Sequence, residues 1–164
     1  MSVIDELLEN AARYAATFPH GDLPAPPAKR VAVLACMDAR LNPYGLLGLS
    51  EGDAHVILNA GGVVTADELR SLAISQRLLG TTEIMLIHHT GCGMLTITEE
   101  QFFSDIEAET GARPSWAAEA FTDLDADIRE NIARIHAEPA IPHQDAVRGF
   151  VYDVADGTLR EVIP

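Results

Sequence analysis

Two short stretches hold the residues of this sequence that are best suited to chemistry. The first is VAVLACMDAR, in which an apolar run leads into Cys36, with Asp38 and Arg40 following at spacings of two and four. The second is HHTGCG, in which His89 precedes Cys92 by three residues. Thiols and imidazoles serve as nucleophiles or metal ligands, and a carboxylate beside them can move protons. These side chains can act together only if the fold brings the two distant stretches to one place.

Cys36, His89 and Cys92 together predict a zinc site. Two sulfurs and one imidazole nitrogen form a borderline-soft ligand set that suits Zn²⁺. Three protein ligands leave the fourth tetrahedral position open, which distinguishes a catalytic zinc site from a closed structural one. Each motif is weak evidence alone, because an isolated buried cysteine is usually an inert small hydrophobe. Their joint occurrence at the ends of two predicted strands favours the metal site.

Of the two adjacent histidines, His89 is the predicted ligand. Neighbouring residues on a strand face opposite ways, so only one of the pair can join the site. His89 stands three residues before Cys92 and next to the turn-permitting Gly91, whereas we expect His88 to be a core or interface histidine. The other histidines have no ligand-type residues near them in the sequence and are interpreted as ordinary: His20, His55, His136 and His143.

The elements that must position these groups alternate between strand and helix. Short apolar runs predict strands at Val31 to Ala35, His55 to Leu58 and Glu83 to His89, of the kind buried on both faces of a parallel sheet. In open α/β sheets, functional groups gather beyond the carboxyl ends of the strands. If the strands that end at Cys36 and His89 are neighbours, the three candidate ligands converge without strain.

Helix signals separate these strands. Thr65 or Asp67 can cap a helix that runs to about Leu79, with Gly80 as its stop. Thr98 begins another helix, with acidic residues in its first turn. A third helical stretch is predicted over Ser115 to Glu138, with a break near Thr122. The tail alternates around Asp156 and Gly157, which favours a hairpin.

The predicted fold is therefore a single α/β domain over residues 1–164. A mostly parallel central β-sheet is flanked by helices, with an antiparallel C-terminal hairpin and an N-terminal helical arm. The arm and a proline-rich linker occupy residues 1–27, and the catalytic body occupies residues 28–164. Apolar residues at helical spacing give the arm a stripe that needs a partner surface, and a second subunit would supply it. The stripe comprises Ile4, Leu7, Leu8, Ala11 and Ala12.

Charge and composition limit the classes of molecule that we expect this protein to bind. The 164 residues are 48% hydrophobic, and 25 acidic residues against 11 basic ones give a formal net charge of −14. A surface this negative repels nucleic acid and anionic lipid, so we expect neither as a partner. The start of the chain resembles an amphipathic helix rather than an export signal, and no apolar run approaches a membrane span. We therefore expect a cytoplasmic protein whose two cysteines stay reduced.

At this point the residues resemble a known family. C-M-D-A-R followed by a distant H-T-G-C resembles the C-x-D-[SA]-R … H-x-x-C signature of the β-class carbonic anhydrases. The resemblance covers nearly the whole chain and is greatest to short bacterial, mycobacterial-type members. It implies a zinc lyase with one Zn²⁺ per subunit on Cys36, His89 and Cys92. The implied reaction is reversible hydration of carbon dioxide to bicarbonate and a proton by zinc-bound hydroxide. A homodimer, or a dimer of dimers, with pockets at the subunit interface is also implied.

The same resemblance implies that Asp38 and Arg40 form a catalytic dyad. A hydrogen-bond acceptor beside the metal helps to generate and orient the attacking water, and Asp38 is within reach of that position. Arg40 can clamp Asp38 through a bidentate ion pair and keep the carboxylate off the metal. If the clamp fails, Asp38 becomes the fourth ligand of a closed form, which would lose activity as the pH falls.

The walls of the pocket are predicted less directly. The segment that follows the second strand contains Asn59, Ala60, Gly61 and Gly62, and its glycines permit a close backbone approach. We expect these residues and Gly93 to line the pocket, although a plain loop would look the same. The aromatic residues Phe102, Phe103 and Trp116 are interpreted as packing residues rather than substrate contacts.

Three alternatives remain open at the level of sequence. The same scaffold and zinc site would also suit hydrolysis of carbon disulfide or carbonyl sulfide, because the difference lies in access to the pocket. A non-catalytic zinc-binding module would need a closed fourth position, for which Asp38 is the only local ligand. A cysteine hydrolase or redox enzyme would use Cys36 with His89 and would keep its activity after chelation.

Overall fold

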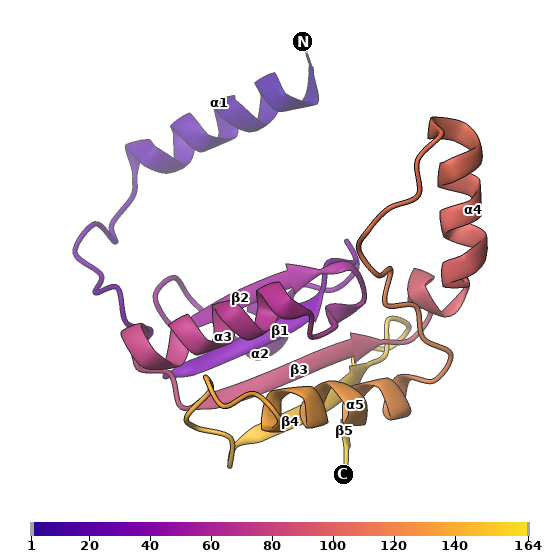
Figure 1. Ribbon diagram of the computed structural model, residues 1–164. Coiled ribbons are helices and arrows are strands. Elements are labelled where there is room, and N and C mark those ends of the chain that lie inside the picture. Colours follow the sequence, from indigo (N-terminus) through magenta and orange to yellow (C-terminus); the bar gives the residue numbers. More distant parts are fainter. Residues whose placement is uncertain (1, 164) are drawn as a thin grey trace.

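The computed structural model describes residues 2–163 (Figure 1). Met1 and Pro164, which begin the predicted arm and end the predicted body, lie outside the described residues. Within this part of the chain one sheet has the strand order β2-β1-β3-β4-β5, with the first four strands parallel and β5 antiparallel to β4. The predicted α/β class is confirmed. The strands are β1 (Val31–Cys36), β2 (Ala54–Asn59), β3 (Glu83–His89), β4 (Val147–Tyr152) and β5 (Leu159–Val162).

The helices begin and end where local capping chemistry places them. Thr65, rather than Asp67, caps α3 (Ala66–Leu79), and Gly80 ends that helix with a left-handed φ of 74°. Thr98 caps α4 (Glu99–Thr110) as predicted. The short α2 (Pro43–Leu47), with Asn42 as its cap, was not predicted. The remaining helices are α1 (Val3–Ala16), α5 (Leu124–His136) and the single turns η1 (Ala60–Gly62) and η2 (Gly93–Leu95).

One predicted helical stretch is wrong in its first third. Residues 115–123 form an irregular segment, and only Leu124–His136 is helical. The segment is rich in alanine, which favours a helix, but tertiary packing overrides that weak preference. Its backbone turns at Glu119, which adopts a positive φ of 56°. Phe121 is buried in an apolar cluster, whereas Trp116 is 56% exposed and lines a cavity.

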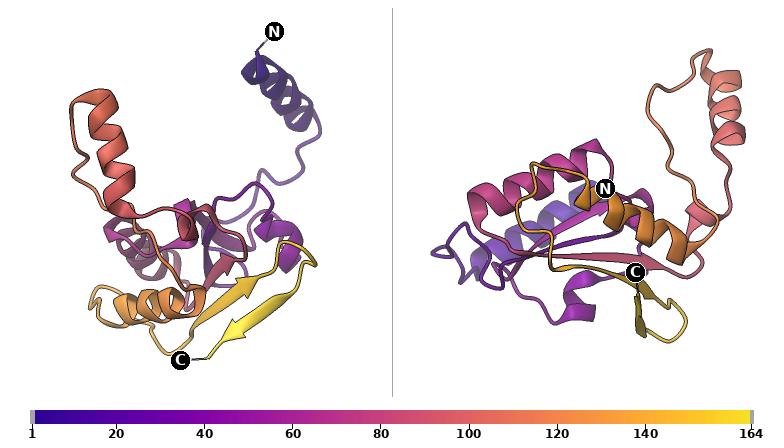
Figure 2. Two further views of the ribbon diagram at one scale, coloured as in Figure 1. Left: turned by 90° about the vertical axis from the view of Figure 1, so that its right-hand side faces the viewer. Right: turned by 60° about the horizontal axis from the view of Figure 1, so that its bottom comes forward.

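Helices cover the two faces of the sheet unequally (Figures 1 and 2). On one face Leu34 and Leu86 pack against Leu72 of α3 and against Ile128 and Ile132 of α5, which forms the main core. On the opposite face lies the short α2, over a smaller apolar cluster. Alternation along β3 therefore turns His88 toward α5 and His89 toward the other side.

Two elements project from this body, as Figure 2 shows. The helix α1 stands away from the sheet at the end of the proline-containing linker, and none of its residues is buried. The helix α4 and the segment after it rise from the carboxyl end of β3. Among residues 2–163, no helix combines the length and apolarity that a membrane span requires.

Candidate metal centre

The topology brings the two chemical motifs together. Strand β1 lies next to β3 and parallel to it, so Cys36 and His89 end two adjacent strands at the same edge of the sheet. A turn through Gly91, at φ 64°, returns Cys92 to the same place. The ligand atoms of Cys36, His89 and Cys92 all lie within 4.8 Å of one another, and all three residues are buried. In the described chain this is the one group of three histidine, cysteine or acidic residues with such proximity.

This group fits a zinc ion. The two sulfurs are 4.0 Å apart, close to the ~3.8 Å that two Zn–S bonds of ~2.3 Å span in a tetrahedron. Nδ1 of His89 lies 3.0 Å from the carbonyl oxygen of Thr90 and donates to it, so Nε2 presents its lone pair to the sulfurs. That Nε2 is buried and has no hydrogen-bond partner within residues 2–163. A divalent cation would satisfy this otherwise unpaired atom.

The electrostatics of the thiols also suit a cation. The hydrogen bond with Cys92 lowers the pKa of Cys36, assisted by His89 and by the backbone N–H groups of Asp38 and Gly61, and outweighs the opposing effect of burial. The same hydrogen bond and burial raise the pKa of Cys92. Because a metal binds thiolates, metal binding at this pair would displace protons from the sulfurs.

The net pKa shift of His89 is upward. Burial lowers the pKa of the imidazole, but the nearby Cys36 sulfur, the hydrogen bond to the carbonyl of Thr90 and the charge of Asp38 together raise this pKa by more. Because only the neutral imidazole can bind a metal, protons compete with the metal at this nitrogen as the pH falls.

Asp38 is held beside the metal ligands by Arg40. Its Oδ1 accepts hydrogen bonds of 2.9 Å from both the backbone N–H and Nε of Arg40, and its Oδ2 accepts one of 2.7 Å from Nη2. Arg40 Nη2 also donates to the carbonyl of Gly91 at 3.1 Å, which ties the pair to the second motif. These bonds hold the pKa of Asp38 far below its ordinary value. Asp38 Oδ2 lies 3.6 Å from Nε2 of His89.

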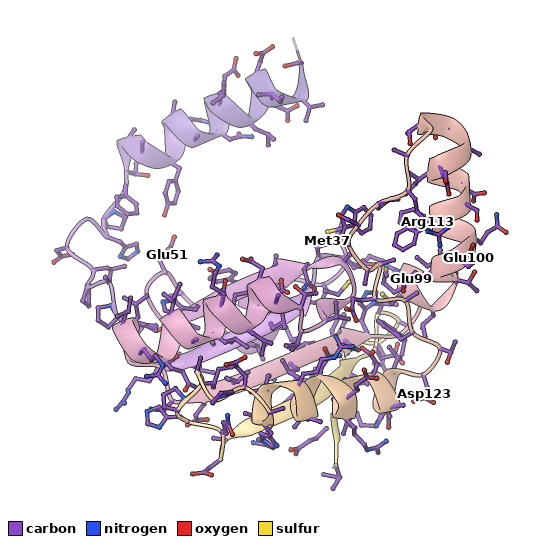
Figure 3. All side chains as sticks on the ribbon, in the orientation of Figure 1. Met37, Glu51, Glu99, Glu100, Arg113 and Asp123 are labelled. Atoms are coloured by element: carbon purple, nitrogen blue, oxygen red, sulfur yellow. The ribbon has the colours of Figure 1, made fainter. Side chains whose placement is uncertain are left out.

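A small cavity opens onto this group. It has a volume of about 190 Å³ and includes the predicted lining residues Ala60, Gly61 and Gly93. Two methionines that sequence reasoning missed also line it: Met37, at the carboxyl end of β1 (Figure 3), and Met94. Their only sequence signal is adjacency, since each stands within two residues of a predicted ligand. The full lining is Cys36, Met37, Asp38, Ala60, Gly61, Cys92, Gly93 and Met94.

The other two predicted lining residues lie elsewhere. Asn59 lines a neighbouring cavity of about 370 Å³, which shares Ala60 and Met94 with the smaller one. Gly62 lines neither of these two cavities. It packs beneath the ligands, because a Cβ at Gly62 would lie 2.8 Å from the backbone N of Cys36. Its role is close packing rather than contact with the cavity.

The aromatic residues form one cluster beside the larger cavity. Phe103 packs edge-on against Trp116, and Phe102 lies next to both rings. Phe102 and Trp116 also line the cavity, so they are wall residues as well as packing residues. His88 is fully buried in the core, as expected for the residue that faces away from the metal ligands.

Known proteins are similar to this chain in sequence along its whole length. The family model for carbonic anhydrase matches residues 31–138. A protein named beta-carbonic anhydrase 1, from Mycobacterium tuberculosis strain H37Rv, is 54% identical over 164 residues that cover 100% of both chains. The chain belongs to the β-carbonic anhydrase family. The family assignment made from the two motifs is thereby confirmed.

Further relatives of this β-carbonic anhydrase include both carbonic anhydrases and a carbon disulfide hydrolase. The crystal structure of a carbonic anhydrase from Streptococcus mutans has a TM-score of 0.93 and 40% sequence identity, and the match covers 99% of each chain. A carbon disulfide hydrolase from Saccharolobus solfataricus is 32% identical over 160 residues, which cover 83% of this chain and 78% of the hydrolase. Both activities considered at the level of sequence therefore occur among its relatives, and the more similar proteins are carbonic anhydrases.

Proposed function

We propose that this β-carbonic anhydrase catalyses the reversible hydration of carbon dioxide to bicarbonate and a proton, with a zinc ion held by Cys36, His89 and Cys92. The observation that carries the proposal is the full-length 54% identity to a protein named beta-carbonic anhydrase 1. The convergence of two buried sulfurs and one unpaired imidazole nitrogen supports the zinc site independently.

Each residue of the site has a separate role in the proposed reaction. A bound zinc ion supplies Lewis acidity that brings the ionisation of water into the neutral range. Asp38 accepts a hydrogen bond from the attacking water and so orients it toward carbon dioxide. Arg40 keeps the Asp38 carboxylate ionised and fixed. The apolar surface of Ala60, Gly61 and Met94 offers carbon dioxide a site without competing hydrogen bonds.

The Asp38–Arg40 pair also bears on whether the site is open. A carboxylate tied at both oxygens to Arg40 is held back from the fourth ligand position, and this supports an open resting site. Loss of that tie would free Asp38 to become a metal ligand and close the site.

Zinc content and carbon dioxide hydration, measured on one sample, test the proposal. We expect one zinc per chain, stopped-flow hydration that is lost with chelation and regained with Zn²⁺, and an Asp38→Asn variant that retains zinc but turns over far more slowly. Folded protein without zinc, or zinc-loaded protein without hydration, would contradict the proposal. Activity that survives chelation but is blocked by thiol alkylation would instead indicate cysteine-based catalysis.

Hydrolysis of carbon disulfide or carbonyl sulfide is a second candidate, because a relative at 32% identity is named a carbon disulfide hydrolase. Release of H₂S from either substrate, assayed beside carbon dioxide hydration, separates the two activities. We expect hydration to dominate, in line with the higher identity to carbonic anhydrases. Folded, zinc-loaded protein that is inactive toward all of these substrates, and whose zinc content and stability do not change in Asp38→Asn, would favour a non-catalytic zinc module.

We propose a homodimer, or a dimer of dimers, as the working form, and the cytoplasm as its location. The support for the dimer is α1, which is amphipathic and has no buried residue in the described chain. Two free thiols only 4.0 Å apart support a reducing compartment, because an oxidising one would favour their disulfide over the metal site.

A further inference from the structure

We propose that Asp127, on α5, is a positioning residue for the metal pocket, acting through the side chains of His88 and Asn131. The proposal rests on the proposed function, because it concerns the same site. Asp127 touches neither the candidate ligands nor the pocket, yet two contact paths from its carboxylate end on the segment that packs beneath Cys36.

The first path starts at His88, the strand neighbour of the candidate ligand His89. Its Nε2 lies 2.7 Å from Oδ2 of Asp127, and since a carboxylate only accepts, Nε2 is the donor. The other ring nitrogen, Nδ1, is buried without a hydrogen-bond partner among the described residues. Within residues 2–163, Asp127 is thus the one hydrogen-bond partner that fixes the orientation of the fully buried His88 ring.

The His88 ring transmits that orientation to the pocket through Phe121. The two rings are stacked, with centroids 5.2 Å apart and an interplanar angle of 19°. Phe121 packs in the apolar cluster that contains Cys36 and Cys92. Its Cε1 lies 3.2 Å from the position that a Cβ on Gly61 would occupy, so the ring supports the glycine turn from one side.

The second path runs through Asn131, one turn further along α5. Its Nδ2 donates to Oδ2 of Asp127 and to the Asp127 carbonyl, each at 2.8 Å, and its Oδ1 accepts a hydrogen bond from the backbone N–H of Val64. Asn131 is 1% exposed, so these bonds are shielded from water. Arg134 adds a hydrogen bond of 3.0 Å to the Val64 carbonyl.

Both paths therefore end on the segment from Gly61 to Val64. This segment has two consecutive glycines at positive φ, 88° and 72°, and Gly62 packs directly against the backbone of Cys36. Because Gly62 approaches the backbone of Ala35 and Cys36 so closely, a shift of the turn would displace the backbone that carries a candidate ligand. Asp127 lies where the two paths meet, and the helix thereby sets the geometry of the site from outside it.

Asp125 provides a matched control on the same helix. It also forms a carboxylate pair, with Arg160 at 2.7 and 3.0 Å, but that pair joins α5 to β5 at the surface and leads nowhere near the metal site. Asp125→Ala and Asp127→Ala remove the same group from one helix. If only Asp127→Ala changes the metal site, the cause is the contacts of Asp127 with His88 and Asn131, because both variants remove one carboxylate from α5.

The test replaces zinc by Co²⁺ and compares the d–d and thiolate-to-cobalt absorption bands of wild type, Asp127→Ala, Asp127→Asn and Asp125→Ala. Zinc affinity, by chelator competition, and kcat and KM for hydration are measured on the same proteins. For Asp127→Ala we expect shifted cobalt bands and a 10- to 100-fold loss in zinc affinity or kcat. Asp127→Asn, which still accepts from His88, should recover part of the loss, and Asp125→Ala should match wild type within about twofold.

Folded Asp127→Ala with wild-type cobalt bands, zinc affinity and kcat would overturn the proposal, as would an equal change in Asp125→Ala. If Asp127→Ala does not fold, Asp127→Asn becomes the test of the proposal. Unchanged cobalt bands in Asp127→Asn would then overturn the proposal. Failure of the proposed function would look different, because wild-type protein would then bind metal without hydrating carbon dioxide while the cobalt comparison would still report positioning.

Discussion

Arg40 decides how Asp38 behaves, so its removal gives a clear prediction at the scale of single residues. Arg40→Gln deletes both guanidinium hydrogen bonds to the carboxylate. The lowered pKa of Asp38 then rises toward its ordinary value. A carboxylate with a depressed pKa is ionised above that pKa and is protonated as the pH falls through it. We therefore expect a 10- to 100-fold lower kcat and an acid limb of the pH–rate profile that moves to higher pH.

Arg148→Gln is the matched control for this variant. Arg148 pairs with Glu161 through two hydrogen bonds of 2.7 and 2.6 Å, in the same two-point geometry, but on the surface of the β4–β5 hairpin. Its kcat and pH profile should match those of wild type. An unmoved acid limb in Arg40→Gln, or an equal change in Arg148→Gln, would show that Arg40 does not govern the ionisation of Asp38.

Gly62 is the second residue whose replacement gives a sharp expectation. Gly62→Ala meets a positive φ of 72° and places its Cβ 2.8 Å from the Cys36 backbone N and 2.9 Å from the carbonyl oxygen of Ile87. Backbone strain and overpacking each cost about 1–3 kcal/mol, so we expect a loss of at least this size in the free energy of unfolding, together with weaker zinc retention. Urea titration and metal analysis measure both. Gly21→Ala, with nothing within 4 Å, should change neither.

Sequence reasoning reached the residues whose chemistry is local and missed those whose role depends on packing. Cys36, Asp38 and Arg40 stand close together in the chain, and their types and spacing already indicate the chemistry. Phe121 and Asp127 carry no such signal, because an ordinary aromatic and an ordinary helix carboxylate are common everywhere. Their link to the site becomes visible only in the structure, where Phe121 stacks on His88 and the contacts of Asp127 lead to the segment from Gly61 to Val64.

At the scale of elements, the central unknown was which strands are neighbours. Sequence periodicity predicted β1 and β3 but not their adjacency, because pairing of parallel strands is decided by contacts distant in the chain. The prediction of a helix over residues 115–123 was wrong for a related reason. Its alanines favour a helix locally, whereas Trp116 and Phe121 are placed beside the cavities by packing.

The contact between α5 and β4 supplies the element-scale prediction. A Cβ at Gly149 of β4 would lie 2.1 Å from Cγ2 of Ile128 and 3.3 Å from Cδ1 of Ile132, so the helix rests directly on the glycine backbone. We expect Gly149→Ala to lift α5 and to lower the free energy of unfolding by about 1–3 kcal/mol, as measured by urea titration. Because Asp127 lies on α5, the lifted helix should also weaken zinc binding.

A double variant checks that explanation. Ile128→Ala alone removes a buried side chain, which costs about 2–5 kcal/mol. Combined with Gly149→Ala, it vacates the space that the new Cβ needs. The double variant should therefore be less destabilised than the sum of the two single variants. Strict additivity would mean that Gly149 matters for something other than the approach of α5.

At the scale of the whole molecule, one helix leaves its apolar face uncovered within the described chain. Its body buries a continuous core, but α1 exposes the large apolar side chains of Val3, Ile4, Leu7 and Leu8, with exposed fractions of 57–72%. Exposed apolar stripes of this kind mark contact surfaces. Tyr14 anchors only the end of the helix, through a 2.7 Å hydrogen bond to Glu51. The geometry of one chain thus agrees with an arm that packs on a second copy.

A charge placed on this stripe tests the assembly. Burying a leucine contributes about 1.5–3 kcal/mol, and in a symmetric dimer each substitution occurs twice, so Leu8→Glu should weaken dimerisation by about 3–6 kcal/mol, or roughly 10²- to 10⁴-fold. Sedimentation velocity across a concentration series should then show monomers where wild type is dimeric. Glu9→Gln, on the opposite face of α1, changes charge without touching the stripe and should leave the dimer intact. A wild type that is monomeric at all concentrations, or a dimer unaffected by Leu8→Glu, would show that the apolar face of α1 has some other partner.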